Sequence, residues 1–140
     1  MDEQLYVDAS AVVKLFVPEP GAPEFAAAAA AAARMASSRI TFVEVARALR
    51  RRAATDDEHE AMLNHWSTAW QEHDVVDFDQ PLAEHAASLA GYHGLRSLDA
   101  IHLASALVLP PAPLRFATWD RRLWEAARAV GLRTVPAVCP

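Results

Sequence analysis

The chain contains a single cysteine, Cys139, one residue before its last position. One cysteine cannot form an intrachain disulfide, and it cannot build a cysteine-based zinc site. A chain without disulfides suits a reducing compartment, so we expect a cytoplasmic protein. The acidic start Met1–Gln4 lacks the positive charge of a secretory signal peptide, and we therefore expect none.

Long apolar runs are also missing from the sequence. The longest apolar tract, Phe25–Ala33, is mostly alanine, which favours helix but is weakly hydrophobic. A membrane-spanning helix needs about 18 or more apolar residues, so this tract predicts a helix of a soluble protein. The chain has 140 residues, 53% of them hydrophobic and 22% charged, a composition that predicts one folded domain over residues 1–140.

Lysine is nearly absent, because Lys14 is the only one and the other positive charges are arginines. The net charge of −5, taken alone, argues against a nucleic-acid partner. The arginines are unevenly spread, however, since Arg47 and Arg50–Arg52 form one cluster and Arg121–Arg122 a second. These clusters are compatible with a local basic surface for nucleic acid on a chain whose net charge is negative.

Strand-forming and helix-forming segments alternate along the chain. Short apolar runs bounded by turn residues predict strands, and apolar positions at helical spacing after a capping residue predict helices. The predicted strands are 5–7, 39–40, 75–78, 114–117 and 132–135. The predicted helices are 11–16, 22–34, 42–54, 56–72, 81–91, 98–108 and 119–130. This alternation predicts an α/β fold, a three-layer sandwich with a central, mostly parallel sheet flanked by helices.

Several polar residues are predicted to cap these helices. Ser10, Ser97 and Thr118 each stand directly before a helical segment, the position that small hydroxyl residues favour. Thr41 is followed three residues later by Glu44, which is the pattern of a capping box.

Four separated carboxylates stand in apolar or helix-starting contexts: Asp8, Glu44, Asp99 and Asp120. Burying an unpaired carboxylate is unfavourable by several kcal/mol, so acids placed this way are expected to gather around something positive. Asp8 ends a buried strand, and ligand sites of parallel sheets lie at the carboxyl ends of the strands. Helix capping explains Glu44 and Asp120 equally well when each is taken singly.

The composition of this acidic set points to a hard divalent cation. Carboxylates without cysteine or a histidine cluster select Mg²⁺ or Mn²⁺. Such ions serve phosphate chemistry, because they neutralise the phosphoryl group and activate the attacking water. A bound cation would also let an acidic chain handle a polyanion, with the arginine clusters on backbone phosphates.

Four segments together carry a family resemblance. They are Tyr6–Ala11, Thr41–Glu44, Ser97–Ala106 and Thr118–Leu123. In this order and spacing they resemble the PIN-domain ribonucleases, and among these the VapC toxins of bacterial toxin–antitoxin pairs. The resemblance covers essentially the whole chain.

The resemblance implies both a site and an activity. It implies that Asp8, Glu44, Asp99 and Asp120 are the catalytic, metal-binding acids, and that Ser10 and Thr118 support them. The implied activity is Mg²⁺- or Mn²⁺-dependent endonucleolytic cleavage of RNA by a metal-activated water. The implied partners are a VapB-type antitoxin and a second copy of the chain in a homodimer.

Other residues are interpreted as structural. We expect His102 to be partly buried with Asp99 as its local partner, since the two share a helix face. Trp66 and Trp70 are expected in the core. Trp119 suits either packing at a strand end or stacking on an RNA base.

Competing functions differ in what they need beside Asp8. A haloacid-dehalogenase-like phosphatase or phosphotransferase uses a strand-ending aspartate as nucleophile and wants a second acid two residues on, where this chain has Ser10. A receiver domain would place its acceptor well inside the chain. A housekeeping PIN-domain nuclease of RNA processing and a binding-only relative that has lost its metal remain open.

Overall fold

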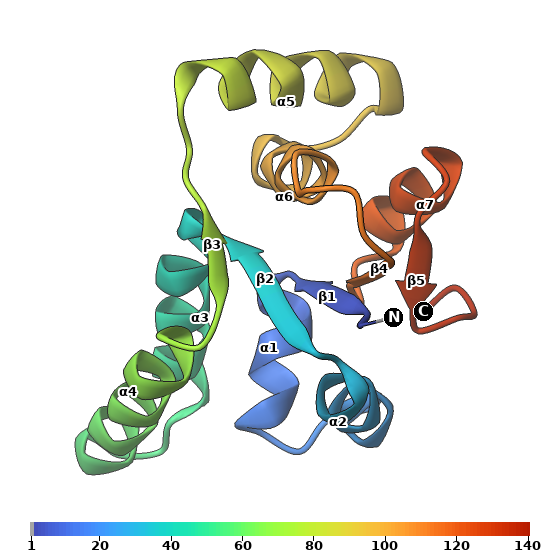
Figure 1. Cartoon of the computed structure of the whole chain (residues 1–140). Helices are drawn as coiled ribbons and strands as arrows, with labels where there is room; N and C mark the ends of the chain where they lie inside the picture. Colours follow the sequence, from blue (N-terminus) through green and yellow to red (C-terminus); the bar gives the residue numbers. More distant parts are fainter. Residues whose placement is uncertain (1) are drawn as a thin grey trace.

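Five parallel strands form the centre of the computed structural model, which describes residues 2–140 (Figure 1). The strand order across the sheet is β3-β2-β1-β4-β5, and every neighbouring pair is parallel. The strands are β1 (Gln4–Val7), β2 (Arg34–Ser38), β3 (Asp74–Val76), β4 (Leu114–Ala117) and β5 (Arg133–Val135).

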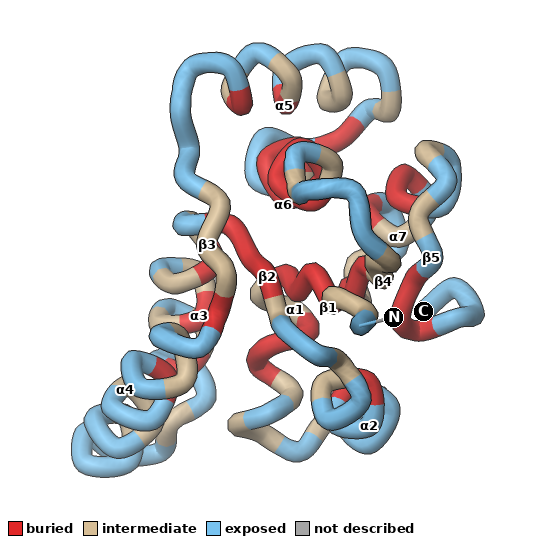
Figure 2. The backbone as a smooth tube through the Cα atoms, viewed as in Figure 1, coloured by how far each residue is buried: buried red, intermediate tan, exposed pale blue. Residues whose placement is uncertain are grey.

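The central strand β1 is buried on both faces, because its side chains alternate between two apolar cores. Tyr6 belongs to one core, with Phe116 stacked on it at 5.0 Å between ring centroids. Leu5 and Val7 belong to the other core, together with Trp66. The red segments of Figure 2 follow this pattern, with β1 almost entirely buried. Two cores on opposite faces of one sheet are the mark of three layers.

Helices cover both faces of the sheet (Figure 1). The Tyr6 face is covered by α5 (Gln80–His93), α6 (Ser97–Leu107) and α7 (Arg121–Ala129). The opposite face is covered by α1 (Ala9–Val12), the 3₁₀ turn η1 (Val13–Leu15), α2 (Ala22–Ala31), α3 (Arg39–Arg52) and α4 (Asp56–Trp70). This architecture confirms the predicted three-layer α/β fold.

The strand predicted at 39–40 is wrong, because β2 lies five residues earlier and α3 begins at Arg39. The polyalanine helix ends at Ala31 instead of Arg34. Residues 34–38 have weak strand propensity, but they fill the gap between β1 and β3 in a fully parallel ladder. Tertiary pairing therefore overrides local preference here.

All four hydroxyl residues predicted as caps are also wrong in that role. Asp8 caps α1 in place of Ser10, and Arg96 takes the N-cap position of α6 in place of Ser97. Thr41 does not cap α3, since Ser38 is the N-cap and accepts from the amide of Ile40. Thr118 does not cap α7, because Asp120 takes that position. The predicted strand 114–117 and the start of α4 at Asp56 match the structure.

The order in which the chain adds strands to the sheet reverses at β1, and a ligand site is expected at this point. From β1 the chain moves outward to β2 and β3, and later returns to add β4 and β5 on the other side. Ligands of open parallel sheets bind outside the carboxyl ends of the strands at such a switch point. Within residues 2–140 no helix combines the length and the apolar character that crossing a bilayer requires.

Candidate active site

Asp8 lies directly after β1, at the switch point of the sheet, and its side chain is almost fully buried. It is the N-cap of α1, where its Oδ1 accepts from the backbone amide of Ala11 at 2.9 Å. The cap therefore falls two residues before Ser10, the residue predicted to cap this helix. This geometry fixes the carboxylate against the backbone.

Ser10 and Thr118, which the family resemblance implied as supporting residues, both contact Asp8. The Ser10 hydroxyl donates to Asp8 Oδ1 at 2.7 Å, and the Thr118 hydroxyl donates to Asp8 Oδ2 at 2.5 Å. Each hydroxyl also accepts a backbone amide, Ser10 from Trp119 and Thr118 from Asp120. The segment after β4 is thereby tied to the end of β1.

Asp99 is in the first turn of α6, and its side chain is largely covered. Its Oδ2 is a buried oxygen without a hydrogen-bond partner. Arg96 Nε approaches this oxygen at 3.5 Å as an ion pair without hydrogen-bond geometry. A buried carboxylate oxygen with no donor is unfavourable unless a cation or water satisfies it.

Asp120 is the N-cap of α7, with its Oδ1 accepting from the amide of Leu123 at 2.9 Å. Its Oδ2 meets Arg96 Nη2 at 3.3 Å. Arg96 thus bridges Asp99 and Asp120, a role that sequence reasoning missed. A basic residue beside a helix N-terminus is disfavoured by the helix dipole. The position of Arg96 directly before α6 is therefore the sequence feature that could have indicated this role.

Glu44 is not part of a capping box, because it lies well inside α3. Its Oε1 is 2.7 Å from Nε2 of His102, and Nδ1 of His102 is 2.8 Å from the hydroxyl of Tyr6. His102 is buried. Its hydrogen-bond partners are Glu44 and Tyr6, which are far away in sequence, instead of the expected neighbour Asp99. Since a carboxylate only accepts, Nε2 carries the proton in this pair. Tyr6 is a further member that the sequence did not reveal.

The pKa values follow from this crowding of charge. Burial raises the pKa of Asp8, although its hydrogen bonds and the charge of His102 oppose this. Burial also raises the pKa of Asp99, and the negative charges of Asp120 and Asp8 add to the effect. Burial lowers the pKa of His102, but the bond to Glu44 and the nearby carboxylates outweigh it, so the net shift is upward. Four acids within electrostatic reach of one another create an excess of negative charge.

The pair of His102 and Glu44 predicts a pH-dependent stability. Because the folded pKa of His102 is raised, its stabilising contribution is complete below the unfolded pKa of about 6.5 and disappears as the pH rises through the folded pKa. Hydrogen bonds to charged groups contribute about 1.5–3 kcal/mol against about 1 kcal/mol for neutral ones. Glu44→Gln is therefore expected to lower the free energy of unfolding by about 1 kcal/mol at mildly acidic pH.

Urea unfolding of wild type and Glu44→Gln at several pH values measures this difference. The gap between the two proteins should shrink at alkaline pH, where His102 is neutral in both. A gap that is constant with pH would contradict a charged pair.

The acids do not form a preformed metal cage. Within residues 2–140, no three histidine, cysteine, aspartate or glutamate side chains are grouped closely enough to hold a metal ion. Glu44 is engaged by His102, and Asp120 by its helix and Arg96. Mg²⁺ nevertheless needs only one or two protein carboxylates, with waters completing its shell. The unpartnered oxygen of Asp99 fits such a ligand, and metal binding by the four acids stays a prediction.

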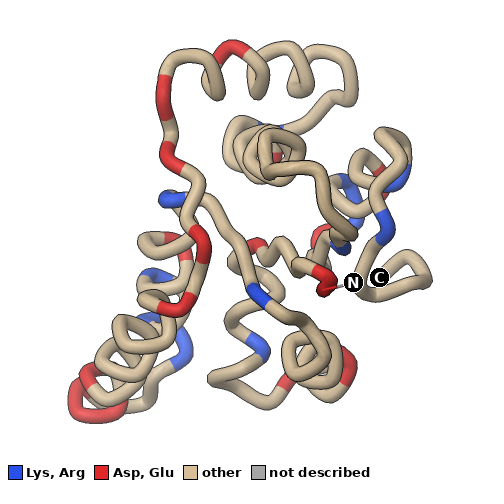
Figure 3. The backbone as a smooth tube through the Cα atoms, viewed as in Figure 1, with Lys and Arg blue, Asp and Glu red and all other residues tan. Residues whose placement is uncertain are grey.

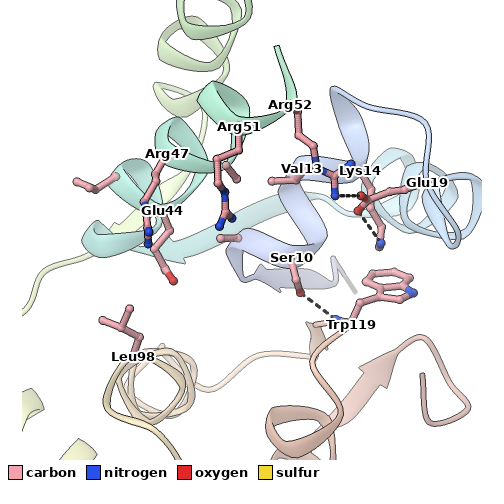
Figure 4. A pocket seen from close by; sticks show the side chains of 13 residues that line it. Ser10, Val13, Lys14, Glu19, Glu44, Arg47, Arg51, Arg52, Leu98 and Trp119 are labelled. Carbon is pink, nitrogen blue, oxygen red and sulfur yellow. Dashed lines mark hydrogen bonds and ion pairs between the residues drawn. The ribbon is translucent and has the colours of Figure 1, made fainter. Parts of the chain in front are cut away.

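A pocket of about 610 Å³ includes one of the four acids, Glu44, in its lining (Figure 4). The other three acids do not line it, but their sequence neighbours Ser10, Leu98 and Trp119 do. Ser10 and Glu44 both line this pocket, and α3 provides one of its walls. Trp119 lines the opposite side, where Lys14 Nζ lies 4.8 Å from its ring centroid and Phe25 meets it edge-on. Trp119 therefore packs at the strand end, as one of its two expected roles requires, and stacking on an RNA base stays a prediction. Trp66 is buried and Trp70 packs beside it, as expected of core residues.

The sequence is similar to a known family over most of its length. The family model of the PIN domain matches residues 5–110. Ribonuclease VapC49 and Ribonuclease VapC45 of Mycobacterium tuberculosis are each 39% identical over 137 residues, covering 95% of this chain and 95% of each relative. Ribonuclease VapC46 of the same organism is 32% identical over 131 residues, 94% of this chain and 95% of that protein.

Solved structures share the fold at lower identity. FitAcB from Neisseria gonorrhoeae superposes with a TM-score of 0.70 at 18% identity, covering 93% of this chain and 95% of that chain. A toxin–antitoxin complex from Klebsiella pneumoniae gives a TM-score of 0.65 at 22% identity, covering 83% of this chain and 86% of that chain.

Proposed function

The chain belongs to the PIN-domain family, among the VapC ribonucleases, and from this we propose that it is the endoribonuclease toxin of a toxin–antitoxin pair. The proposed reaction is hydrolysis of an RNA phosphodiester at the four acids beside this pocket, with Mg²⁺ or Mn²⁺ as cofactor. One observation carries the proposal. Buried carboxylates with raised pKa values and an unpartnered oxygen stand beside a pocket with basic walls.

The residues of the chain have distinct tasks in this proposal. Asp8 and Asp99 would hold the cation, with Asp120 and Glu44 as the outer acids. A divalent cation bound there supplies charge neutralisation at the phosphate and a lowered pKa of the attacking water. Ser10 and Thr118 keep the Asp8 carboxylate in one orientation, and His102 does the same for Glu44.

Neither alternative function is favoured. The relatives are named as VapC ribonucleases, which argues against a housekeeping nuclease. A phosphatase of the haloacid-dehalogenase type needs an acid at the position of Ser10, whose hydroxyl here donates to Asp8.

The proposed partners are a VapB-type antitoxin and a second copy of the chain. The structures of similar fold include a toxin–antitoxin complex. Val43 and Leu98 line the pocket with 67% and 48% of their surface exposed, so a protein partner could cover apolar surface at its rim. Expression of the chain alone should arrest growth, and co-expression of a short neighbouring gene should relieve the arrest.

Metal removal tests the catalytic proposal directly. Purified protein should cleave single-stranded RNA with Mg²⁺ or Mn²⁺, lose cleavage in excess EDTA, and regain it when the cation is restored. Asp8→Asn should be inactive under all three conditions while its circular dichroism spectrum matches wild type. Cleavage that persists in EDTA, or full activity of Asp8→Asn, would refute the metal mechanism.

A further inference from the structure

One stripe of α3 faces the pocket and carries two arginines. Glu44, Arg47 and Arg51 are spaced three and four residues apart, which places them on one side of a helix. All three line the pocket, and Figure 4 shows their side chains extending from α3 toward it. A rise of about 1.5 Å per residue puts Arg51 about 6 Å beyond Arg47 along the helix axis.

These two arginines differ from the other cations nearby because they have no acidic partner within residues 2–140. Lys14 and Arg52 both pair with Glu19 at 2.8 Å. Arg50 pairs with Asp56 at 2.8 Å, and Figure 3 shows this basic end of α3 beside the acidic start of α4. For Arg47 and Arg51, residues 2–140 provide no ion pair and no side-chain hydrogen bond. Their charge is thus available to a ligand of the pocket.

We propose that Arg47 and Arg51 form a subsite for two backbone phosphates of a single-stranded RNA, next to the phosphate that is cleaved. The inference rests on the proposed ribonuclease function and specifies how the same pocket holds its substrate. Arginine forks bind phosphate oxygens in pairs, which makes the contact strong and directional.

The subsite is expected to fix the position of the RNA in the pocket without selecting its base sequence. Phosphate contacts fix the register of a nucleic acid but carry no base information. On the opposite side of the pocket, the ring of Trp119 contacts Lys14 and Phe25. Selection of the cleaved sequence therefore has to come from contacts other than Arg47 and Arg51.

The salt dependence of RNA binding tests this assignment. Binding of a fluorescent, unstructured single-stranded RNA is measured by anisotropy over a series of KCl concentrations, in an Asp99→Asn background that cannot cleave. Each lost phosphate contact reduces the slope of log K against log salt by about 0.7 for single strands. The double variant Arg47→Ala/Arg51→Ala should therefore bind more weakly, and the magnitude of its negative slope should be smaller by about 1.4.

Two matched variants sharpen the result. Arg50→Ala removes a neighbouring arginine of the same helix that is already paired with Asp56. The slope of log K against log salt for this variant should therefore equal that of the Asp99→Asn parent. Arg47→Lys/Arg51→Lys keeps both charges and should keep the slope while losing part of the affinity, because lysine lacks the fork.

An unchanged slope in the double alanine variant, or an equal loss in Arg50→Ala, would overturn the subsite and leave the two arginines to a protein partner. Wild-type cleavage of the same RNA with metal, measured in parallel, separates this failure from failure of the proposed function. Wild-type protein that neither binds nor cleaves RNA would overturn both.

Discussion

Asp99→Asn is expected to abolish RNA cleavage and, without metal, to raise the melting temperature of the protein. The loss of cleavage should be about 10²–10³-fold or more, the effect of removing one electrostatic group from a reaction centre. The gain in stability has a separate cause. Ionised Asp99 is largely covered, and one of its oxygens accepts no hydrogen bond. Burial and the charges of Asp120 and Asp8 outweigh its attraction to Arg96 and His102, so asparagine removes an unfavourable charge.

The pH dependence of this gain follows from the raised pKa of Asp99. An acid whose pKa is higher in the folded state destabilises the fold once the pH exceeds both its unfolded and its folded pKa. The advantage of Asp99→Asn should therefore be present at neutral pH and fade in acid, where the carboxyl of the wild type is protonated. Each kcal/mol corresponds to about 4 °C in a chain of this size.

Thermal unfolding by calorimetry in EDTA, at neutral and at acidic pH, measures the stability part, and a gel assay of RNA cleavage measures the activity part. Asp79→Asn is the matched control, because Asp79 is an exposed N-cap of α5 away from the pocket. It should leave both cleavage and melting temperature near wild type. An active Asp99→Asn, or one that melts earlier than wild type, would contradict the role given to this carboxylate.

Gly21→Ala is expected to be the most destabilising of the small substitutions near the pocket. Gly21 is the N-cap of α2 with φ of 88°, and an added Cβ would lie 2.4 Å from Trp119 Nε1. The left-handed backbone adds about 1–2 kcal/mol for a residue with a side chain, and overpacking adds about 1–3 kcal/mol. Trp119 would have to move, and its backbone amide is bonded to Ser10, so cleavage should fall as well.

Gly131→Ala separates the two contributions. Gly131 has φ of 90°, but nothing lies within 4 Å of its added Cβ. Urea unfolding should show the backbone effect alone in Gly131→Ala and a larger loss in Gly21→Ala. Equal losses would show that contact with Trp119 adds nothing.

The sequence predicted the fold wherever local signals and tertiary structure agree. The strand at 114–117 and the helix starting at Asp56 have clear local patterns and lie where expected. The strand Arg34–Ser38 was missed, because its residues have little strand preference and are held by pairing with both neighbours. The early start of α3 follows from that strand, and it removes the capping-box explanation for Glu44.

The contacts among the candidate site residues could be predicted from the sequence only in part. The end of a buried strand singled out Asp8, whereas its contacts with Ser10 and Thr118 were expected only from the family resemblance. The bonds of His102 span 58 residues to Glu44 and 96 residues to Tyr6. Arg96 likewise reaches Asp120 over 24 residues. No periodicity in one sequence encodes such partners, since they depend on how the helices pack.

The bond between Thr118 and Asp8 joins residues that are 110 positions apart, and this separation has a consequence for biosynthesis. Chains fold from the N-terminus as they leave the ribosome, so β1 can pair with β2 early, while β4 and the Thr118 hydroxyl that follows it come late. A nascent copy therefore holds its strand-ending acid without the clamp that orients it. The strand-ending carboxylate is therefore held in one orientation only after the segment that follows β4 has been synthesised.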